Sequence, residues 1–142
     1  MPEHHASRPL AVDAILVYQH KLVFIRRRNE PYKDMLALPG GFVEAEETTE
    51  QAVLREVEEE TGLKSEILKL VGVYSNPHRD PRGAVISVCY LLKATGTYKA
   101  SSDASEVILL ALKDIPGLAF DHNVMISDSK KECDLDGILS EV

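Results

Sequence analysis

Three glutamates are the side chains best placed for chemistry in this chain: Glu56, Glu59 and Glu60, in the segment AVLREVEEETG (residues 52–62). On an α-helix, with about 100° between successive residues, they share one face about 100° wide. Carboxylates crowded on one face repel each other, and they lose solvation where that face borders a buried stripe. A hard divalent cation such as Mg²⁺ or Mn²⁺ relieves both costs, because it prefers oxygen ligands. A solvated, charged helix face is the alternative interpretation.

The helix that must hold these glutamates has start and stop signals in the sequence. Thr48 is a suitable N-cap, and Gln51 three residues later can complete a capping box. The helix is predicted to run to about Thr61 and to stop at Gly62, which suits the left-handed position after a helix. The apolar stripe beside the glutamate face is predicted to contain Val53, Leu54 and Val57.

The remaining elements predict a mixed β-sheet with helices packed against it, because strands and helices do not alternate regularly. A strong turn signal, Pro39-Gly40-Gly41, precedes the glutamate helix, and a polar loop with two prolines covers residues 75–83. Asp121 is expected to cap a second helix that reaches about Lys131, with frayed residues after it. Strands are predicted at residues 10–18, 22–28, 35–38, 67–74, 84–93 and 106–112.

Length and composition predict one domain. The chain has 142 residues, 44% of them hydrophobic, enough for a core without staples. We expect a single domain over 1–142, with a core of about 9–131, short flexible termini and no room for a further domain. No apolar stretch suits a membrane span or a secretory signal. Two cysteines do not make a disulfide framework, and Cys89 is expected to be a buried thiol, so a cytoplasmic protein is predicted.

The net charge of −7 is a local feature. Residues 44–60 hold eight glutamates and a single basic residue, Arg55, while the rest of the chain is balanced. An acidic chain without a broad basic face is unsuited to nucleic-acid polymers, which need Lys and Arg against their phosphates. The expected partner is a small molecule, with no nucleic-acid polymer and no membrane.

The segment GFVEAEETTEQAVLREVEEETGL (residues 41–63) resembles the box of the Nudix hydrolase family. That pattern is Gly, five residues, Glu, seven residues, then Arg-Glu-apolar-any-Glu-Glu-any-Gly-apolar. A solvated helix face would not require this order of residues. Every fixed position is met, by Gly41, Glu47, Arg55, Glu56, Val57, Glu59, Glu60, Gly62 and Leu63.

The resemblance implies a fold, a cofactor and roles for these residues. The expected fold is α/β (α+β), an α/β/α sandwich with a mixed sheet, and the expected cofactor is Mg²⁺, with Mn²⁺ as a substitute. Glu47 and Arg55 would orient the glutamates, as supporting residues around metal sites do. The metal ligands would be Glu56, Glu59, Glu60 and Gly41.

The resemblance leaves the general base open. A carboxylate must take the proton of the attacking water. Glu59 and Glu60 are candidates inside the box, and Glu106 is a candidate outside it, after the polar segment SSDAS (residues 101–105). For Glu106, a surface position at the start of a strand is the alternative.

Segments outside the box resemble the ADP-ribose pyrophosphatase branch: LALPGGFVE (36–44), YSNPHRDPRG (74–83) and LKDIPGLAFDH (112–122). This implies hydrolysis of ADP-ribose to AMP and ribose 5-phosphate. Ala84 departs from that branch, which often has a polar residue there. Core packing is expected for Phe42 and Tyr74, with stacking on a base as the alternative. Candidate substrate contacts are Arg26, Arg28, Arg79 and Arg82, against the alternatives of a solvated strand end and a plain turn.

Two other functions remain open. One is the pyrophosphohydrolysis of nucleoside triphosphates, including oxidised ones, because the same box serves both reactions. The other is a non-catalytic Nudix domain that senses a nucleotide, although such domains tend to lose the helix glutamates. A homodimer is a further expectation from the resemblance.

Overall fold

The computed structural model describes residues 7–97 and 106–142. The expectations for the N-terminal residues 1–6 and for the segment 101–105 lie outside the described residues. In chain order the elements are β1 (Leu10–Tyr18), β2 (Lys21–Arg26), β3 (Leu36–Ala37), β4 (Gly40–Phe42), α1 (Thr49–Thr61), β5 (Ser65–Tyr74), β6 (Ile86–Ala94), β7 (Val107–Leu110), a short 3₁₀ turn (Leu112–Asp114), α2 (His122–Glu132) and α3 (Leu135–Glu141).

The strands of the described residues form one mixed sheet, as predicted. The main path runs β3-β2-β1-β6-β5, with β4 paired to β1 and β7 paired to β2. β1 and β6 run parallel, with Val12 opposite Val88, and the other pairings are antiparallel. Within the described part of the chain, no helix is both long and apolar enough to cross a membrane.

β1 is buried on both faces, which explains its nearly unbroken apolar sequence. Because side chains alternate along a strand, Ala14 and Leu16 face one layer while Ile15 and Val17 face the other. Asp13 is the polar exception and is only 8% exposed. By the same alternation it points to the side of Ile15, a direction that becomes important for the site.

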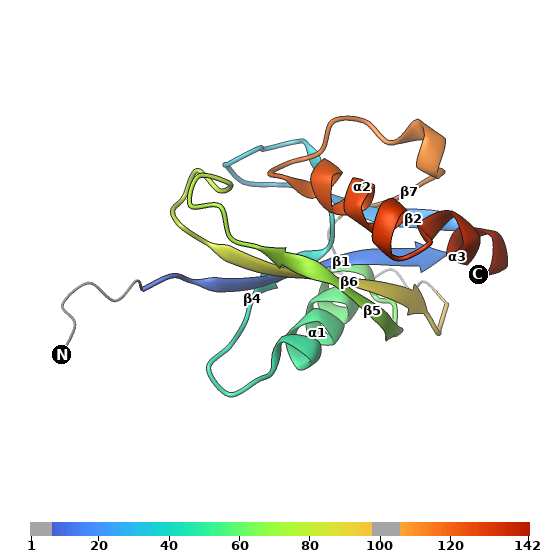
Figure 1. Ribbon diagram of the computed structural model, residues 1–142, viewed down its shortest axis with the longest axis horizontal. Helices are drawn as coiled ribbons and strands as arrows, with labels where there is room; N and C mark the ends of the chain where they lie inside the picture. The colour runs from blue at the N-terminus through green and yellow to red at the C-terminus, as the bar shows by residue number, and fades with distance from the viewer. Residues whose placement is uncertain (1–6, 98–105) are drawn as a thin grey trace.

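Helices cover both faces of the sheet (Figure 1). α1 packs on the Ala14–Leu16 side through Ala52, Val53 and Val57. On the other side, α2 and α3 bury Met125, Ile126, Leu135 and Leu139. The arrangement has the helix–sheet–helix layers that were expected.

The caps of α1 follow the sequence prediction. The Thr48 side chain accepts from the Gln51 backbone N–H, and the Gln51 side chain accepts from the Thr48 backbone N–H, so the capping box is complete. Gly62 takes the left-handed conformation with φ of 73°. The prediction for Leu54 was wrong: it is 36% exposed, and Ala52 is buried in its place. Leu54 lies on the far edge of the stripe that faces the sheet.

Three other predictions need correction. Gly40 and Gly41 were expected in a turn, but with Phe42 they form β4, where Gly40 pairs with Asp13 of β1. The residues after Lys131 were expected to fray, but they form α3, because Leu135 and Leu139 bury their side chains in the core. Phe42 was expected in the core and is 45% exposed.

The loop over residues 75–84 is closed at its base by Arg8. The Arg8 Nε donates to the Ala84 carbonyl at 2.8 Å, and its Nη2 donates to the Ser75 carbonyl at 2.6 Å. One side chain near the N-terminus therefore joins the two ends of this loop.

Candidate active site

A cavity of about 330 Å³ is lined by β1, the β3–β4 segment, α1, the loop 75–84 and the start of α2. Two groups of residues in its lining differ in chemistry. The first, the glutamate cluster, consists of Gly40, Gly41, Glu56 and Glu60. The second, the paired-charge cluster, consists of Asp13, Arg79, Asp80, Arg82 and His122.

The helical spacing of α1 explains which glutamates reach the cavity. The buried residues Ala52 and Val57 bracket an arc of about 140°, and Glu60 falls near the middle of that arc. Glu56 falls inside it as well. Glu59 falls just beyond its edge, and its side chain is accordingly 59% exposed. Glu56 and Glu60 line the cavity, whereas Glu59 does not.

The two glycines of β4 allow the carboxylates to approach the sheet. The Gly40 N–H donates to Glu60 Oε2 at 3.1 Å. A Cβ on Gly41 would lie 2.5 Å from Cδ of Glu56, and a Cβ on Gly40 would lie 2.2 Å from the Val12 carbonyl oxygen. A side chain at either position would therefore displace a carboxylate or the strand beneath it.

Burial makes ionisation of these carboxyls unfavourable. It raises the pKa of Glu60 to about 8, against the opposing hydrogen bond from Gly40. Burial also raises the pKa of Glu56, while Arg55 opposes the shift. Within the described residues, no Lys or Arg lies within ion-pair distance of Glu60. The Glu60 carboxylate therefore has no ion-pair partner among the described residues.

Arg55 connects the acidic residues around α1. Its Nε donates to Glu47 at 3.0 Å, and its Nη1 donates to Glu56 at 2.7 Å and to Glu59 at 3.3 Å. The hydrogen bond from Arg55 lowers the pKa of Glu47 to about 2. Arg55 therefore fixes the Glu56 carboxylate from the side away from the cavity.

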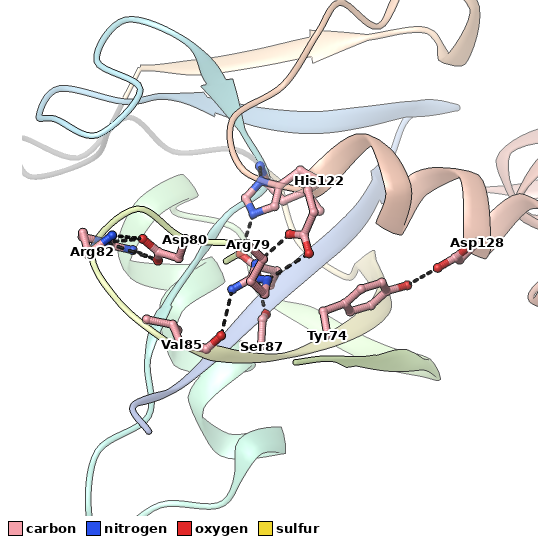
Figure 2. Close-up of polar contacts among 11 residues, drawn as sticks. Tyr74, Arg79, Asp80, Arg82, Val85, Ser87, His122 and Asp128 are labelled. Carbon is pink, nitrogen blue, oxygen red and sulfur yellow. Dashed lines mark hydrogen bonds and ion pairs between the residues drawn. The ribbon is translucent and has the colours of Figure 1, made fainter. Parts of the chain in front are cut away.

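The arginines of the paired-charge cluster form ion pairs within the cluster and with the neighbouring Asp121 (Figure 2). The buried Arg79 side chain donates twice to Asp121, at 2.9 and 2.7 Å, and its Nη2 lies 3.9 Å from Asp13 Oδ2. Arg82 makes a bidentate pair with Asp80, with Nη2–Oδ2 at 2.8 Å and Nε–Oδ1 at 3.1 Å. Asp121 precedes α2 as predicted, but its side chain makes no cap hydrogen bond because Arg79 occupies both oxygens.

Residues 7–128 match the family model of the NUDIX domain. The chain belongs to the Nudix family. This Nudix chain is 50% identical over 120 residues to the ADP-ribose pyrophosphatase of Methanocaldococcus jannaschii, across 84% of this chain and 71% of that protein. It is 32% identical over 126 residues to the ADPR-responsive transcriptional repressor NtrR of Acinetobacter baylyi, across 84% of this chain and 50% of the repressor. The Nudix chain thus spans about half of that relative.

Solved structures agree with the predicted fold. The NUDIX domain of Shewanella oneidensis NrtR complexed with ADP ribose superposes with a TM-score of 0.79 and 30% identity, covering 92% of each chain. A bifunctional NMN adenylyltransferase/ADP ribose pyrophosphatase from Francisella tularensis, complexed with AMP and a Mn ion, has a TM-score of 0.75 and 30% identity. That match covers 89% of the Nudix chain and 42% of the other.

The donor set of the glutamate cluster suits a hard cation. In residues 7–97 and 106–142, no three His, Cys, Asp or Glu side chains converge closely enough to enclose a metal ion. Two of the predicted ligands, Glu56 and Glu60, nevertheless line one cavity together with Gly41. All three offer oxygen donors, and the partly buried Glu60 forms no ion pair with a described side chain. These residues fit Mg²⁺ or Mn²⁺.

Besides Glu59, three further predicted site residues of the Nudix chain, all outside α1, lie outside the cavity. Glu106 is exposed and forms an ion pair with Arg26 at 3.1 Å. Arg26 also donates to the Asp34 carbonyl at 2.9 Å. Arg28 is exposed and does not line the cavity.

Arg27, which the sequence analysis passed over, does line the cavity. Its Nε donates to the Pro31 carbonyl at 2.7 Å, and its guanidinium lies 4.9 Å from the centre of the Phe120 ring. No described carboxylate lies within ion-pair distance of it. Burial and the nearby Arg82 lower its pKa. The sequence carried no signal for this, because the predicted strand over 22–28 placed Arg27 on the opposite face from Arg26 and Arg28, whereas β2 ends at Arg26.

Proposed function

We propose that this Nudix chain hydrolyses ADP-ribose between its two phosphates, giving AMP and ribose 5-phosphate, with Mg²⁺ as cofactor. The observation that carries the proposal is that one cavity contains a carboxylate, Glu60, and a guanidinium, Arg27, neither of which forms an ion pair among the described residues. A cation suits the first and a phosphate suits the second. The 50% identical pyrophosphatase supports ADP-ribose as the substrate.

In this proposal Glu56, Glu60 and the Gly41 carbonyl hold the metal, and Glu59 joins them if it turns from Arg55. Bound metal would offset the charge of the pyrophosphate and activate water for attack on phosphorus. Arg55 keeps the Glu56 carboxylate in place through its 2.7 Å hydrogen bond. The proton of the attacking water would go to Glu60, which lines the cavity, or to Glu59 of the same helix once it turns from Arg55, whereas Glu106 lies outside the cavity on another element and is paired with Arg26.

The cationic residues receive the substrate in this proposal. Arg27 offers its two terminal nitrogens to a phosphate, with burial strengthening the interaction. Arg82 lies 5.2 Å from the centre of the Phe42 ring and 5.4 Å from that of Phe120. These rings provide apolar faces for the base or a ribose. Arg79 contributes through its buried pair with Asp121 and has less freedom to reach the substrate.

A turnover screen tests the proposal. ADP-ribose, other nucleotide sugars, dinucleotides and nucleoside triphosphates are incubated with Mg²⁺ or Mn²⁺, and the products are resolved by chromatography. We expect AMP and ribose 5-phosphate from ADP-ribose in preference to pyrophosphate from triphosphates. Glu60→Gln should lower kcat by about 10²–10⁴-fold, whereas the exposed Glu58→Gln on the same helix should not. Preferred release of pyrophosphate from a triphosphate would contradict the substrate assignment.

ADP-ribose sensing without catalysis is the second candidate, because a repressor that responds to ADPR and an ADP ribose complex of a related domain are among the similar proteins. Calorimetry separates the two functions. A sensor binds ADP-ribose with no turnover, and Glu60→Gln leaves its response unchanged. The predicted homodimer is tested on the same samples by light scattering.

A further inference from the structure

If the proposed function holds, the glutamate cluster must be held in place for the metal by residues around it. His122, the first residue of α2, is 3% exposed. The Leu38 N–H donates to His122 Nδ1 at 3.0 Å. An imidazole nitrogen that accepts a hydrogen bond carries a lone pair, so the ring proton must be on Nε2. His122 is therefore neutral and held in one tautomer.

Asp13 explains why that tautomer is favoured. Its Oδ1 lies 3.3 Å from His122 Nε2, so the carboxylate faces the ring N–H. Its Oδ2 accepts from the Ser87 hydroxyl. A carboxylate that orients an imidazole in this way fixes which nitrogen is left to accept a hydrogen bond.

Leu38 lies two residues before Gly40, which belongs to the glutamate cluster. Pro39 has no N–H, so the amides of Leu38 and Gly40 are the two donors on either side of it. One of them is bound by His122 and the other by Glu60. The Pro39 carbonyl is held as well, because it accepts from the Ala14 N–H at 2.8 Å. The segment 38–40 is thus fixed between the start of α2, β1 and the carboxylate of α1.

We propose that Asp13 and His122 are positioning residues: they hold the Leu38–Gly41 segment so that Gly40 and Gly41 present Glu60 and Glu56 to the metal. The contacts join positions 84 residues apart in sequence, Leu38 and His122. Asp13 acts through the imidazole and the imidazole acts through the Leu38 amide. Neither residue needs to touch the metal for this role.

Two substitutions of His122 separate its hydrogen bond with Leu38 from its contact with Asp13. His122→Asn places an amide oxygen near the position of Nδ1 and can still accept from Leu38. His122→Gln places an amide nitrogen near the position of Nε2 and leaves the buried Leu38 N–H without an acceptor. The two variants therefore differ in the contact that the proposal makes essential.

The measurement is Mn²⁺ binding to substrate-free protein, followed by the electron paramagnetic resonance signal of free Mn²⁺. We expect His122→Gln to raise the Mn²⁺ Kd about 10-fold and His122→Asn to change it by less than about threefold. Hydrogen exchange at the Leu38 amide should be faster in His122→Gln than in His122→Asn. Equal Kd values for the two variants, or equal Leu38 exchange, would overturn the proposal.

The role of Asp13 is tested by a double-mutant cycle. Asp13→Val removes the carboxylate that fixes the tautomer, and we expect it to raise the Mn²⁺ Kd about 10-fold in the native background. In the His122→Asn background, where no tautomer needs fixing, the same change should have a smaller effect. The loss of negative charge is common to both backgrounds and cancels in the comparison. Equal effects would overturn the role of Asp13.

These results are distinguishable from a failure of the proposed function. If the unaltered protein binds no Mn²⁺, the proposed function fails and the positioning role fails with it. If it binds Mn²⁺ but does not cleave ADP-ribose, the substrate assignment fails while the comparison of His122 variants remains valid. A thermal unfolding curve for each variant establishes that the protein measured is folded.

Discussion

The glutamate cluster and the paired-charge cluster border the same cavity but handle buried charge differently. Glu60 is partly buried, with one backbone hydrogen bond and no ion pair among the described residues. The Arg79 side chain is only 4% exposed, and it donates two hydrogen bonds to Asp121. A buried group without a partner is costly to the fold, whereas a fully satisfied one is rigid. The difference indicates that the first cluster is built to receive a ligand and the second to act as its support.

The largest effect on stability is expected from removing the buried ion pair between Arg79 and Asp121. Arg79→Met leaves Asp121 and the nearby Asp13 without the guanidinium, and we expect the free energy of unfolding to fall by about 3–5 kcal/mol. The matched control is Arg26→Met, which breaks the exposed pair with Glu106 and should cost about 0–1 kcal/mol. Urea denaturation of metal-free protein measures both. Similar losses for the two variants would contradict the supporting role.

The glutamate cluster should respond to pH in the opposite sense to a stabilising carboxylate. With a native pKa of about 8 and an ordinary value of 4.5, Glu60 binds more proton in the folded state between these values. The free energy of unfolding should therefore fall as pH rises from 5 to 8, by about 2–4 kcal/mol in metal-free protein. Mg²⁺ should restore stability at pH 8.

Glu60→Gln is the decisive variant for this pH dependence. It should flatten the profile and make the metal-free protein more stable at pH 8 than the unaltered chain, while turnover is lost. The exposed Glu58→Gln should keep the original profile. A flat profile in the unaltered protein, measured by urea denaturation in the presence of a chelator, would show that Glu60 is not held in a costly state.

Gly41→Ala tests the glutamate cluster alone, because it should displace the Glu56 carboxylate while the protein stays folded. The added Cβ would meet the flexible end of Glu56, so the side chain can move aside at little cost in stability. Because Glu56 is then displaced, we expect kcat/KM to fall about 10–100-fold. Gly117→Ala, at a position with open space around it, is the control. An unchanged kcat/KM for Gly41→Ala would separate Glu56 from the reaction.

The smallest expected effect is at Arg27. Arg27→Met removes the guanidinium that lacks a carboxylate partner, and we expect KM for ADP-ribose to rise about 10-fold. Since this group binds rather than reacts, kcat should change less. Arg28→Met, at the neighbouring position outside the cavity, should leave KM within about twofold. A larger effect at position 28 than at position 27 would reverse the assignment.

The sequence predicted what local patterns determine. The caps of α1 and the positions of Glu56 and Glu60 on it follow from helical spacing and from residues a few positions apart. The contacts of the paired-charge cluster could not be predicted from local patterns. The Arg79–Asp121 and His122–Leu38 contacts join positions 42 and 84 residues apart. The exposure of Glu59 depended on how the helix is rotated against the sheet.

The substrate contacts were harder to predict for a similar reason. Alternation along a strand was extended to Arg28, but β2 ends at Arg26, so Arg27 is the residue that turns into the cavity. Glu106 was selected from its place after a polar segment, and its partner Arg26 lies 80 residues away. α3 was missed because a seven-residue helix has little intrinsic stability and forms here by burying Leu135 and Leu139.

Arg8, near the N-terminus, stabilises the loop over residues 75–84 through two hydrogen bonds. Its hydrogen bonds to the Ser75 and Ala84 carbonyls hold the two ends of the loop together. The segment that carries Arg79 and Arg82 is therefore a closed loop. Removing residues 1–8 would remove both of these hydrogen bonds. The shortened protein should keep its core and its glutamates, whereas its affinity for the nucleotide should fall.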